Sequence, residues 1–353
     1  MTVALDWADQ IRLQMGPLSA ALQEPGVYEV VVNRPGELWV ETRAGWRKDV
    51  VGELTLDRLQ SLARAVASYS GDVVDGERPI LSATLPTGER IQVVRAPAVT
   101  AGTISLTIRK PSSATFSLRE LQEKSLFADV GTRDRSRTVE IDARLTMLLD
   151  CGDVEGFLRA AVKANKNIII SGATGSGKTT LSKSLIAEIP LDERIITIED
   201  TAELVVPHEN RVQLLYAMGG RGRAQVTAKQ LVESSLRMRP SRVLLAELRD
   251  GVAFYFVRNV NSGHPGSITT VHASSPFLAF EQLTLLVKES EGGRDLARDD
   301  IRGLLAGAID VVVQCERGVN GFRVPEIYFG PRDRAAMLAG ERGLGKGSEC
   351  GGL

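Results

Sequence analysis

A glycine-rich loop between an apolar run and a helical segment constrains this chain more than any other feature. Residues 172–179 read Gly-Ala-Thr-Gly-Ser-Gly-Lys-Thr, which is the pattern G-x-x-x-x-G-K-[ST], and they follow the apolar residues 168–170. In a strand–loop–helix setting, such glycines let backbone N–H groups converge on phosphate oxygens, and the next helix directs its N-terminus at the same anion. The sequence therefore predicts a nucleoside triphosphate site built from Gly172, Ala173, Thr174, Gly175, Ser176, Gly177, Lys178, Thr179 and Thr180.

Two side chains of this loop have individual expected roles. Lys178 is expected to reach the β- and γ-phosphates, and the hydroxyl of Thr179 is expected to hold Mg²⁺. The predicted cofactors are therefore ATP and Mg²⁺, with Thr179 as the metal ligand.

The first third of the chain has the pattern of a mixed α/β domain. Apolar bursts broken by turn residues predict an antiparallel meander over residues 27–50, and residues 54–69 carry a helical apolar face. Three further strands are predicted at 80–85, 90–94 and 103–108. We therefore expect an N-terminal domain over residues 1–110 and a linker over 111–140 with one short helix at 118–127.

The second half alternates strand-like and helical segments. Strands are predicted at 168–171, 195–199, 243–246, 267–271 and 309–313, and helices at 179–189, 226–238, 251–262, 276–290 and 298–308. This alternation is typical of a parallel sheet with helices on both faces. The second domain is expected to span residues 141–335, and residues 336–353, which are glycine-rich toward their end, are expected to be disordered. The predicted fold class is thus α/β.

Composition and charge exclude several classes of function. Lys and Arg number 43 against 44 Asp and Glu, so the chain has no global field that would recruit nucleic acid. Its three cysteines are far apart and indicate no disulfide framework, which favours a cytoplasmic setting. Asp6 and Asp9 stand where an export signal would be apolar, and no apolar run approaches the roughly 18 residues of a membrane span. We therefore expect any membrane association to occur through partners.

Carboxylates follow two of the predicted strands. Glu199, Asp200 and Glu203 come after the strand at 195–198, and Glu247 comes after the strand at 243–246. Because ligands bind at the carboxyl ends of parallel strands, Glu199 and Glu203 are expected to orient water or hold the metal through water. The alternative is a solvated acidic loop. Ala246 takes the place of the Asp that usually ends a Walker B strand, so Glu247 alone is expected to act near the attacking water.

Histidines and arginines supply the remaining candidates. His272 follows the strand at 267–271 and is expected to sense the γ-phosphate; a structural role is the alternative. A metal pair with His264 lacks a third ligand at metal spacing, and His208 is interpreted as structural. Phosphoryl transfer is helped by a cation outside the loop, and Arg109 is favoured because it adjoins the interdomain junction. The full set of arginine candidates is Arg109, Arg194, Arg237, Arg239 and Arg249.

Taken together, these segments resemble the secretion or traffic ATPase superfamily. The resemblance lies in five boxes in order, at residues 172–180, 193–204, 236–240, 246–249 and 263–273. Within the superfamily, residues 78–83, 85–92 and 105–111 add a similarity to the traffic ATPases of VirB-type type IV secretion systems, the family of the eleventh VirB component.

This resemblance implies a homohexameric ring, with ATP held between the N-terminal domain and the RecA-like P-loop NTPase domain that follows it. It implies domain motion driven by hydrolysis, at the cytoplasmic face of the bacterial inner membrane. The implied partners are other type IV secretion ATPases and inner-membrane components, with no sequence-specific nucleic-acid binding. Carried over by motif, the functional residues are Lys178, Thr179, Glu199, Glu203, Glu247, His272 and Arg109.

Three positions depart from the family pattern. Ser241 replaces a usual Asp, and Asp250 and Val252 replace a usual Gly and Glu, which puts ion pairs at a subunit contact in doubt. The alternatives to a secretion motor are a nucleic-acid motor of the RecA-helicase type and a nucleotide-gated scaffold with little turnover. The sequence leaves open whether the cargo is DNA, protein or both.

Overall fold

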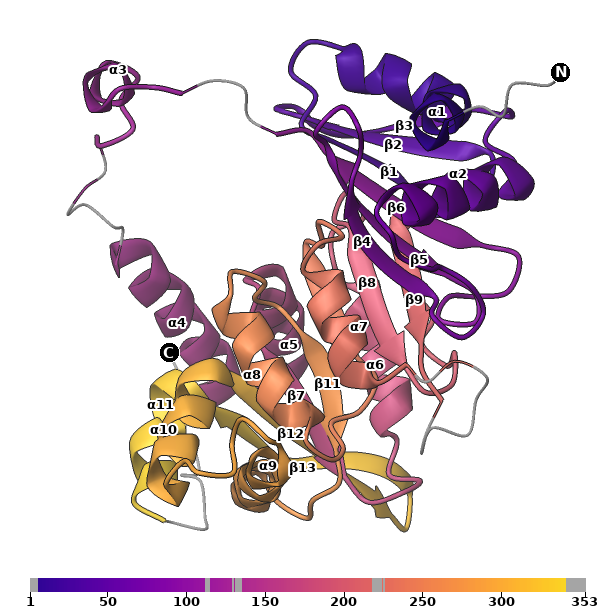
Figure 1. Ribbon diagram of the computed structural model, residues 1–353. Coiled ribbons are helices and arrows are strands. Elements are labelled where there is room, and N and C mark those ends of the chain that lie inside the picture. Colours follow the sequence, from indigo (N-terminus) through magenta and orange to yellow (C-terminus); the bar gives the residue numbers. More distant parts are fainter. Residues whose placement is uncertain are drawn as a thin grey trace, which may run out of the picture.

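The computed structural model describes residues 6–111, 115–128, 130, 135–217, 224 and 226–340, and it contains two domains joined by a connecting segment (Figure 1). The N-terminal domain has a six-stranded antiparallel sheet in the order β3-β2-β1-β6-β5-β4, covered by two helices. Its elements are α1 (Trp7–Gln23), β1 (Glu29–Val32), β2 (Glu37–Thr42), β3 (Gly45–Val50), α2 (Leu56–Tyr69), β4 (Ile80–Thr84), β5 (Arg90–Arg95) and β6 (Ile104–Arg109).

The core of this domain lies between the two helices and the sheet. Buried residues of α1 and α2, such as Leu18, Leu59 and Leu62, join those of the strands in one apolar cluster. The predicted meander over 27–50 is the run β1–β2–β3. Helix α1 was absent from the sequence-based prediction, because Gly16 has a non-helical backbone and Pro17 follows it, which interrupts the helical pattern.

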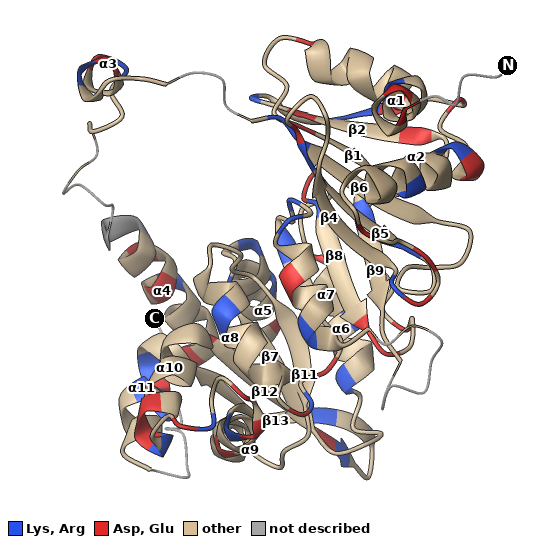
Figure 2. Cartoon of the chain, viewed as in Figure 1, with Lys and Arg blue, Asp and Glu red and all other residues tan. Residues whose placement is uncertain are grey.

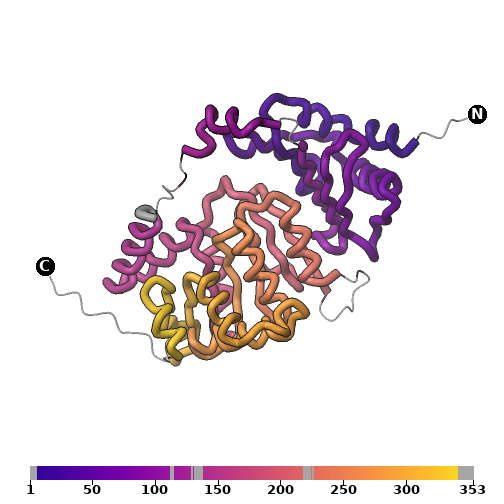
Figure 3. The backbone as a smooth tube through the Cα atoms, turned by 60° about the vertical axis from the view of Figure 1, so that its left-hand side comes forward, coloured from indigo at the N-terminus to yellow at the C-terminus, as the bar shows by residue number. Residues whose placement is uncertain are grey.

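The connecting segment leaves the N-terminal domain after β6. It forms the short helix α3 (Leu118–Glu123), which begins at a capping box between Ser117 and Glu120 and has no buried residue. In Figure 1 this helix stands away from both domains, and Figure 3 shows the same segment running along one side of the molecule. Helix α4 (Arg135–Asp150) then packs on the C-terminal domain, so it begins inside the region predicted as linker.

The C-terminal domain contains two sheets in place of the single parallel sheet that the sequence predicts. One has the order β10-β8-β9 and the other β11-β7-β12-β13, and every pairing in them is parallel except that of β13 with β12. The strands are β7 (Ile168–Gly172), β8 (Ile195–Glu199), β9 (Arg211–Leu215), β10 (Arg242–Leu245), β11 (Ile268–Val271), β12 (Val311–Gly318) and β13 (Gly321–Phe329).

The two sheets meet edge to edge at a seam between β10 and β11. Side chains take the place of ladder hydrogen bonds there: Ser267 Oγ donates to the Val243 carbonyl at 2.8 Å, and Thr270 Oγ1 donates to the Ala246 carbonyl at 2.9 Å. Beyond the strand end, the Leu248 N–H donates to the Thr270 carbonyl at 2.8 Å. Side-chain hydrogen bonds from Ser267, directly before β11, and from Thr270 therefore join the two sheets where no strand ladder does.

Helices cover both faces of these sheets, as predicted. Alternate residues of one strand enter different apolar clusters: Ile169 faces the cluster with α7 to α10, whereas Ile168 and Ile170 face the cluster with α4 to α6. The remaining helices are α5 (Val154–Lys163), α6 (Lys178–Ala187), α7 (Ala228–Ser235), α8 (Val252–Asn261), α9 (Pro276–Glu289), α10 (Arg298–Ala308) and α11 (Gly330–Leu338). In α9, Ser275 caps the N-terminus and Pro276 follows it, as the sequence indicates.

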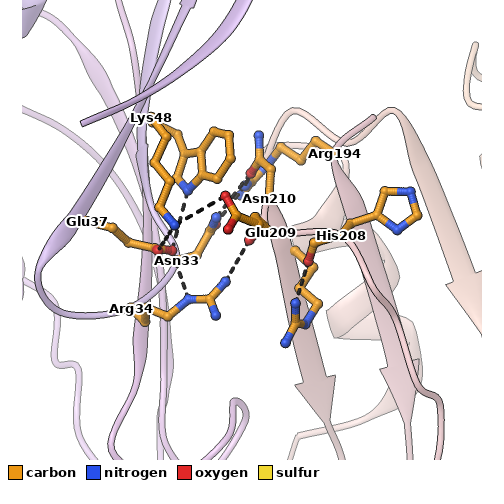
Figure 4. A network of polar contacts seen from close by, with 10 residues as sticks. Asn33, Arg34, Glu37, Lys48, Arg194, His208, Glu209 and Asn210 are labelled. Carbon is orange, nitrogen blue, oxygen red and sulfur yellow. Dashed lines mark hydrogen bonds and ion pairs between the residues drawn. The ribbon is translucent and has the colours of Figure 1, made fainter. Parts of the chain in front are cut away.

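The N-terminal domain contacts the sheet that contains β8 and β9. Val99 forms a β-bridge with Leu214, and the Leu215 N–H donates to the Ala98 carbonyl at 2.9 Å. Beside this bridge lies a polar network that we call the interdomain clamp, centred on Arg194 at the start of β8 (Figure 4). It joins Asn33, Arg34, Glu37 and Lys48 of the N-terminal domain to Arg194, Glu209 and Asn210.

The clamp is buried at its centre. Arg194 is fully buried, and its Nη1 donates to Asn33 Oδ1 at 2.6 Å and to Asn210 Oδ1, while its Nε donates to the Met238 carbonyl at 2.9 Å. Burial lowers the pKa of Arg194 to about 9. The cation is therefore held by neutral oxygens from both domains, with the carboxylates of Glu29, Glu37 and Glu41 acting on it from farther away.

The predicted disordered tail lies largely outside the described residues. Helix α11 extends to Leu338, and residues 341–353 are not described. Across the described part of the chain, no helix combines the length and apolar character that crossing a membrane requires.

Candidate active site

The loop after β7 forms the floor of a polar pocket of about 430 Å³. Gly175 and Gly177 adopt left-handed backbones with φ of 74° and 92°, and α6 begins immediately afterwards at Lys178. A Cβ on Gly172 would lie 2.4 Å from Ser176 Oγ and 2.5 Å from the Cys315 carbonyl, so the loop can close only with glycine there. The backbone thus turns the N-terminus of α6 toward the pocket.

Three side chains from three elements form a polar line across this pocket. Lys178 Nζ lies 3.3 Å from His272 Nδ1, and His272 Nε2 lies 3.1 Å from Glu247 Oε1. Because the ammonium can only donate, the imidazole accepts at Nδ1 and donates from Nε2 to the carboxylate. Lys178 also donates to the Gly172 and Ala173 carbonyls at 2.7 and 2.9 Å, and burial lowers the pKa of its amine while Glu247 opposes that shift.

Arg249 extends the line toward the other sheet. It donates to Glu247 at 2.6 Å and lies 3.2 Å from Asp200, which follows β8. The hydrogen bond to Glu247 raises the pKa of Arg249 above its ordinary value. Of the arginine candidates, Arg249 is the one that lines this pocket.

Glu199 has a different environment from the one that the sequence suggested. Its side chain is fully buried, and it accepts hydrogen bonds from Thr197 Oγ1 at 2.6 Å and from the backbone N–H groups of Glu203 and Leu204 at 2.8 Å each. It does not line the pocket. The carboxylate therefore shapes the loop after β8 and is not placed to contact water or metal.

Asp200, Thr201, Glu203 and Leu204 of that loop do line the pocket. Within the described residues, the Glu203 carboxylate makes no hydrogen bond or ion pair. Glu203 is thus available to a ligand, whereas Glu247 is already bound to His272 and Arg249.

The residues present fit a triphosphate with Mg²⁺. Ser176 Oγ is buried without a hydrogen-bond partner, and Thr179 and Thr180 line the pocket at the first turn of α6. Among the described residues, no group of three or more His, Cys, Asp and Glu side chains is arranged to hold a metal ion. Thr179 is the residue that would hold Mg²⁺, with the other ligands coming from phosphate oxygens and water.

The other arginine candidates lie away from this pocket. Arg109 lines a separate cleft of about 900 Å³ between the N-terminal domain and Arg239 of the C-terminal domain, and its Nε is 3.6 Å from Glu29. Arg237 lies in the adjoining cleft beside His264, and Arg194 is the centre of the clamp. Within one chain, therefore, Arg109 does not reach the loop after β7. His208 is buried, with Nε2 2.9 Å from the Pro190 carbonyl.

Two of the departures have a local structural explanation. Asp250 has φ of 48°, a left-handed backbone that favours glycine but that Asp adopts more readily than most residues. Ser241 Oγ accepts from the Arg194 N–H at 3.0 Å and so supports the start of β8. Val252 is buried at the start of α8.

Phe322 is a pocket residue that sequence reasoning missed. It lies at the start of β13, and a Cβ on Gly177 would come within 2.9 Å of its ring. No local pattern relates position 322 to the loop, because the contact depends on how β12 pairs with β7. Only the sheet order could have revealed it.

A glycine-rich phosphate loop at the N-terminus of α6, opposite a Glu–His pair at the ends of neighbouring strands, defines a P-loop nucleoside triphosphatase. Residues 13–317 match the family model described as Type II/IV secretion system protein. The chain is 53% identical over 338 residues to the type IV secretion system protein VirB11 of Bartonella quintana, covering 93% of this chain and 95% of the relative. It is 43% identical over 340 residues to VirB11 of Brucella suis, covering 95% and 94%.

A solved structure also matches this chain closely. The crystal structure of the VirB11 ATPase from the Brucella suis type IV secretion system, in complex with sulphate, matches with a TM-score of 0.88 at 43% identity, covering 94% of this chain and 98% of that one. The chain belongs to the VirB11 family of type IV secretion ATPases. The predicted fold class, the family and the ATPase activity are thereby confirmed.

Proposed function

We propose that this chain is an ATP-hydrolysing subunit of a homohexameric ring that powers type IV secretion, in pilus biogenesis and in DNA or protein transfer. The observation that carries the proposal is the polar line Lys178–His272–Glu247 across the phosphate pocket. In this proposal Lys178 contacts the terminal phosphates, Glu247 contacts the attacking water, and His272 links the two. The presence of a γ-phosphate therefore changes the hydrogen-bond partners of both Lys178 and Glu247.

The residues have distinct proposed roles. Lys178 leaves the Gly172 and Ala173 carbonyls to bind the β- and γ-phosphates, and the N–H groups of the loop bind the same oxygens. Glu247 accepts the proton of the attacking water, and His272 reports the state of the γ-phosphate to it. Thr179 holds Mg²⁺, whose charge offsets that of the phosphates, and Glu203 orients water in the pocket.

The structure also supports coupling between hydrolysis and domain motion. The pocket lies across the seam: Lys178 and His272 belong to the sheet with β7, whereas Glu247, Arg249 and Asp200 follow strands of the sheet with β8. The interdomain clamp fastens the N-terminal domain to the sheet with β8. A shift between the sheets on hydrolysis would therefore carry the N-terminal domain with it.

In this proposal, ring assembly or domain motion brings Arg109 to the nucleotide. Its cleft contains four cationic side chains, Arg90, Arg109, Lys110 and Arg239, against two carboxylates, Glu29 and Glu41, and this excess of positive charge suits an anionic ligand held by another subunit. Asp250 and Val252 flank a groove beside the pocket and are proposed to lie near a subunit contact. The ring would act at the cytoplasmic face of the inner membrane, with other type IV secretion ATPases and inner-membrane components as partners.

The test combines ATP turnover with light scattering, for the wild type and the Glu247→Gln variant, each with and without DNA. We expect DNA-independent turnover by a particle near six subunits, with about 100-fold or greater loss in the variant. Loss of turnover with retained ATP binding would place Glu247 at the chemical step.

Two results would contradict the proposal. A monomer whose turnover rises steeply with DNA would indicate a nucleic-acid motor instead, and turnover that is negligible in the wild type would indicate a nucleotide-gated scaffold. In the view of Figure 2, basic and acidic residues are interspersed over both domains, which favours the DNA-independent outcome.

A further inference from the structure

Phe322 lies on the side of the phosphate pocket opposite the catalytic groups. It belongs to the β12–β13 hairpin, and its ring lies against Gly177, directly before Lys178. Among the residues that line the pocket, it is the one with a phenyl, phenol or indole ring. The residue is 63% exposed. A large apolar ring that is exposed on the rim of a polar pocket gains free energy if a ligand covers it.

The order of the strands gives the pocket a direction. Reading from the seam, the second sheet runs β11-β7-β12-β13, so the phosphate loop after β7 has β11 on one side and the hairpin on the other. His272 follows β11, and Glu247 and Asp200 follow strands beyond the seam. All the groups that act on the γ-phosphate therefore lie on the β11 side of the loop.

This asymmetry determines where the nucleoside must go. Because the γ-phosphate faces Glu247 and His272, the α-phosphate and the sugar leave the loop in the opposite direction, toward the hairpin. In Figure 1 the hairpin is the yellow pair at the lower edge of the C-terminal domain, where it extends past the other strands. Its partner strand contributes the Cys315 carbonyl that abuts Gly172, so the hairpin is fixed to the base of the loop.

We propose that Phe322 is the platform on which the base of the nucleotide stacks, and that it sets affinity without taking part in hydrolysis. The inference rests on the proposed function, because it assumes that the pocket holds a nucleoside triphosphate. Stacking on an aromatic ring tolerates any base, so this contact strengthens binding of nucleotides generally and does not by itself select adenine.

The test compares a ligand that has a base with one that lacks it. Dissociation constants for Mg-ATP and for inorganic tripolyphosphate are measured by calorimetry on the full chain carrying Glu247→Gln, which prevents turnover. The same measurements are made after adding Phe322→Ala, Phe322→Trp, or Val319→Ala as a control. Val319 is fully exposed in the same hairpin and does not line the pocket.

We expect Phe322→Ala to weaken ATP binding about 5- to 100-fold and to leave tripolyphosphate binding within about 2-fold, since base stacking is lost and the loop is not. Phe322→Trp should retain ATP binding, and Val319→Ala should change neither constant. In the chain with Glu247 intact, Phe322→Ala should raise KM for ATP and leave kcat within about 2-fold.

Other outcomes would overturn the inference in distinguishable ways. An equal loss for ATP and tripolyphosphate would mean that Phe322 only supports the loop through Gly177. No loss for either ligand would mean that the ring touches no nucleotide. If the chain with Phe322 intact bound neither ligand, the proposed function itself would fail along with this inference.

Discussion

Two arginines of the C-terminal domain, Arg194 and Arg249, show how differently one residue type is used in two regions. Arg194 is fully buried in the interdomain clamp, bound to neutral amide and carbonyl oxygens, and burial lowers its pKa to about 9. Arg249 lies in the phosphate pocket with its side chain 38% exposed, bound to Glu247 and Asp200, and its pKa is raised. Both belong to polar networks that join separate elements.

The difference lies in what can replace each partner. In the clamp, the side chains of Asn33, Asn210 and Arg194 are buried, so a lost contact leaves a buried group unsatisfied. In the pocket, water, phosphate or Mg²⁺ can take over from any side chain. The clamp therefore holds a fixed arrangement, whereas the pocket can exchange partners during a reaction cycle.

The largest expected effect is a loss of ATP hydrolysis that leaves the stability of the fold almost unchanged. Lys178→Ala should reduce ATP hydrolysis about 100-fold or more and weaken binding of both ATP and tripolyphosphate, because the cation that binds the terminal phosphates is gone. The free energy of unfolding should change by no more than about 1 kcal/mol, since the truncated side chain lines an open polar pocket and not the apolar core. Turnover assays and urea unfolding measure the two effects. Lys163→Ala, an exposed substitution at the end of α5, is the matched control; wild-type turnover by the Lys178 variant would refute the role of the loop.

The second prediction is the opposite pattern, a loss of stability with phosphate binding retained. Arg194→Ala should lower the free energy of unfolding by about 3 kcal/mol, because it leaves a cavity and removes the donor shared by Asn33 and Asn210. Tripolyphosphate binding at 10 °C, where the variant is still folded, should remain within about 2-fold. Arg249→Ala is the comparison and should cost less than about 1 kcal/mol, since its contacts are partly solvated. Equal destabilisation by the two variants would contradict the distinction between the regions.

The third and smallest effect concerns the edge of the interface. Glu29 is buried on β1, with Arg109 and Arg239 at 3.6 and 3.4 Å, and burial raises its pKa to about 7. Because the folded pKa exceeds the ordinary value, the stabilising contribution is complete below about pH 4.5 and is lost as the pH rises through about 7.

From pH 5 to pH 8, the wild type should therefore lose up to about 2.5 kcal/mol relative to the Glu29→Gln variant, which has no charge to gain. Urea unfolding of both chains at the two pH values measures the difference directly. If the two chains differed in free energy of unfolding by the same amount at both pH values, Glu29 would not change its protonation in this range.

The sequence was most informative where local chemistry decides the structure. The phosphate loop and the strands β7, β8 and β10 have unmistakable patterns, because a strand buried on both faces must be continuously apolar. Strand β9 was missed because its five residues alternate in burial and carry Arg211 and Gln213. Strand β13 was missed because it contains Pro325 and is largely exposed.

Long-range packing explains the remaining differences. Glu199 follows an apolar strand just as Glu247 does, and only the path of the chain after β8 turns its carboxylate back onto the N–H groups of Glu203 and Leu204. Likewise, nothing near Arg194 in the sequence distinguishes a buried arginine from an exposed one. Its environment comes from Asn33, which is 161 residues away.

This separation has a consequence for biosynthesis. At about 5–20 residues per second, Asn33 is synthesised roughly 10 to 30 seconds before Arg194, its partner across the clamp. The apolar core of the N-terminal domain is drawn from residues 11–108, so it can close during that interval. The surface that must wait combines the polar side chains of Asn33, Arg34, Glu37 and Lys48 with the apolar side chains of Val94, Ala98 and Val99, which are buried in the apolar cluster of the C-terminal domain. Until the C-terminal domain has folded, a nascent chain therefore exposes this apolar patch, to which a chaperone can bind.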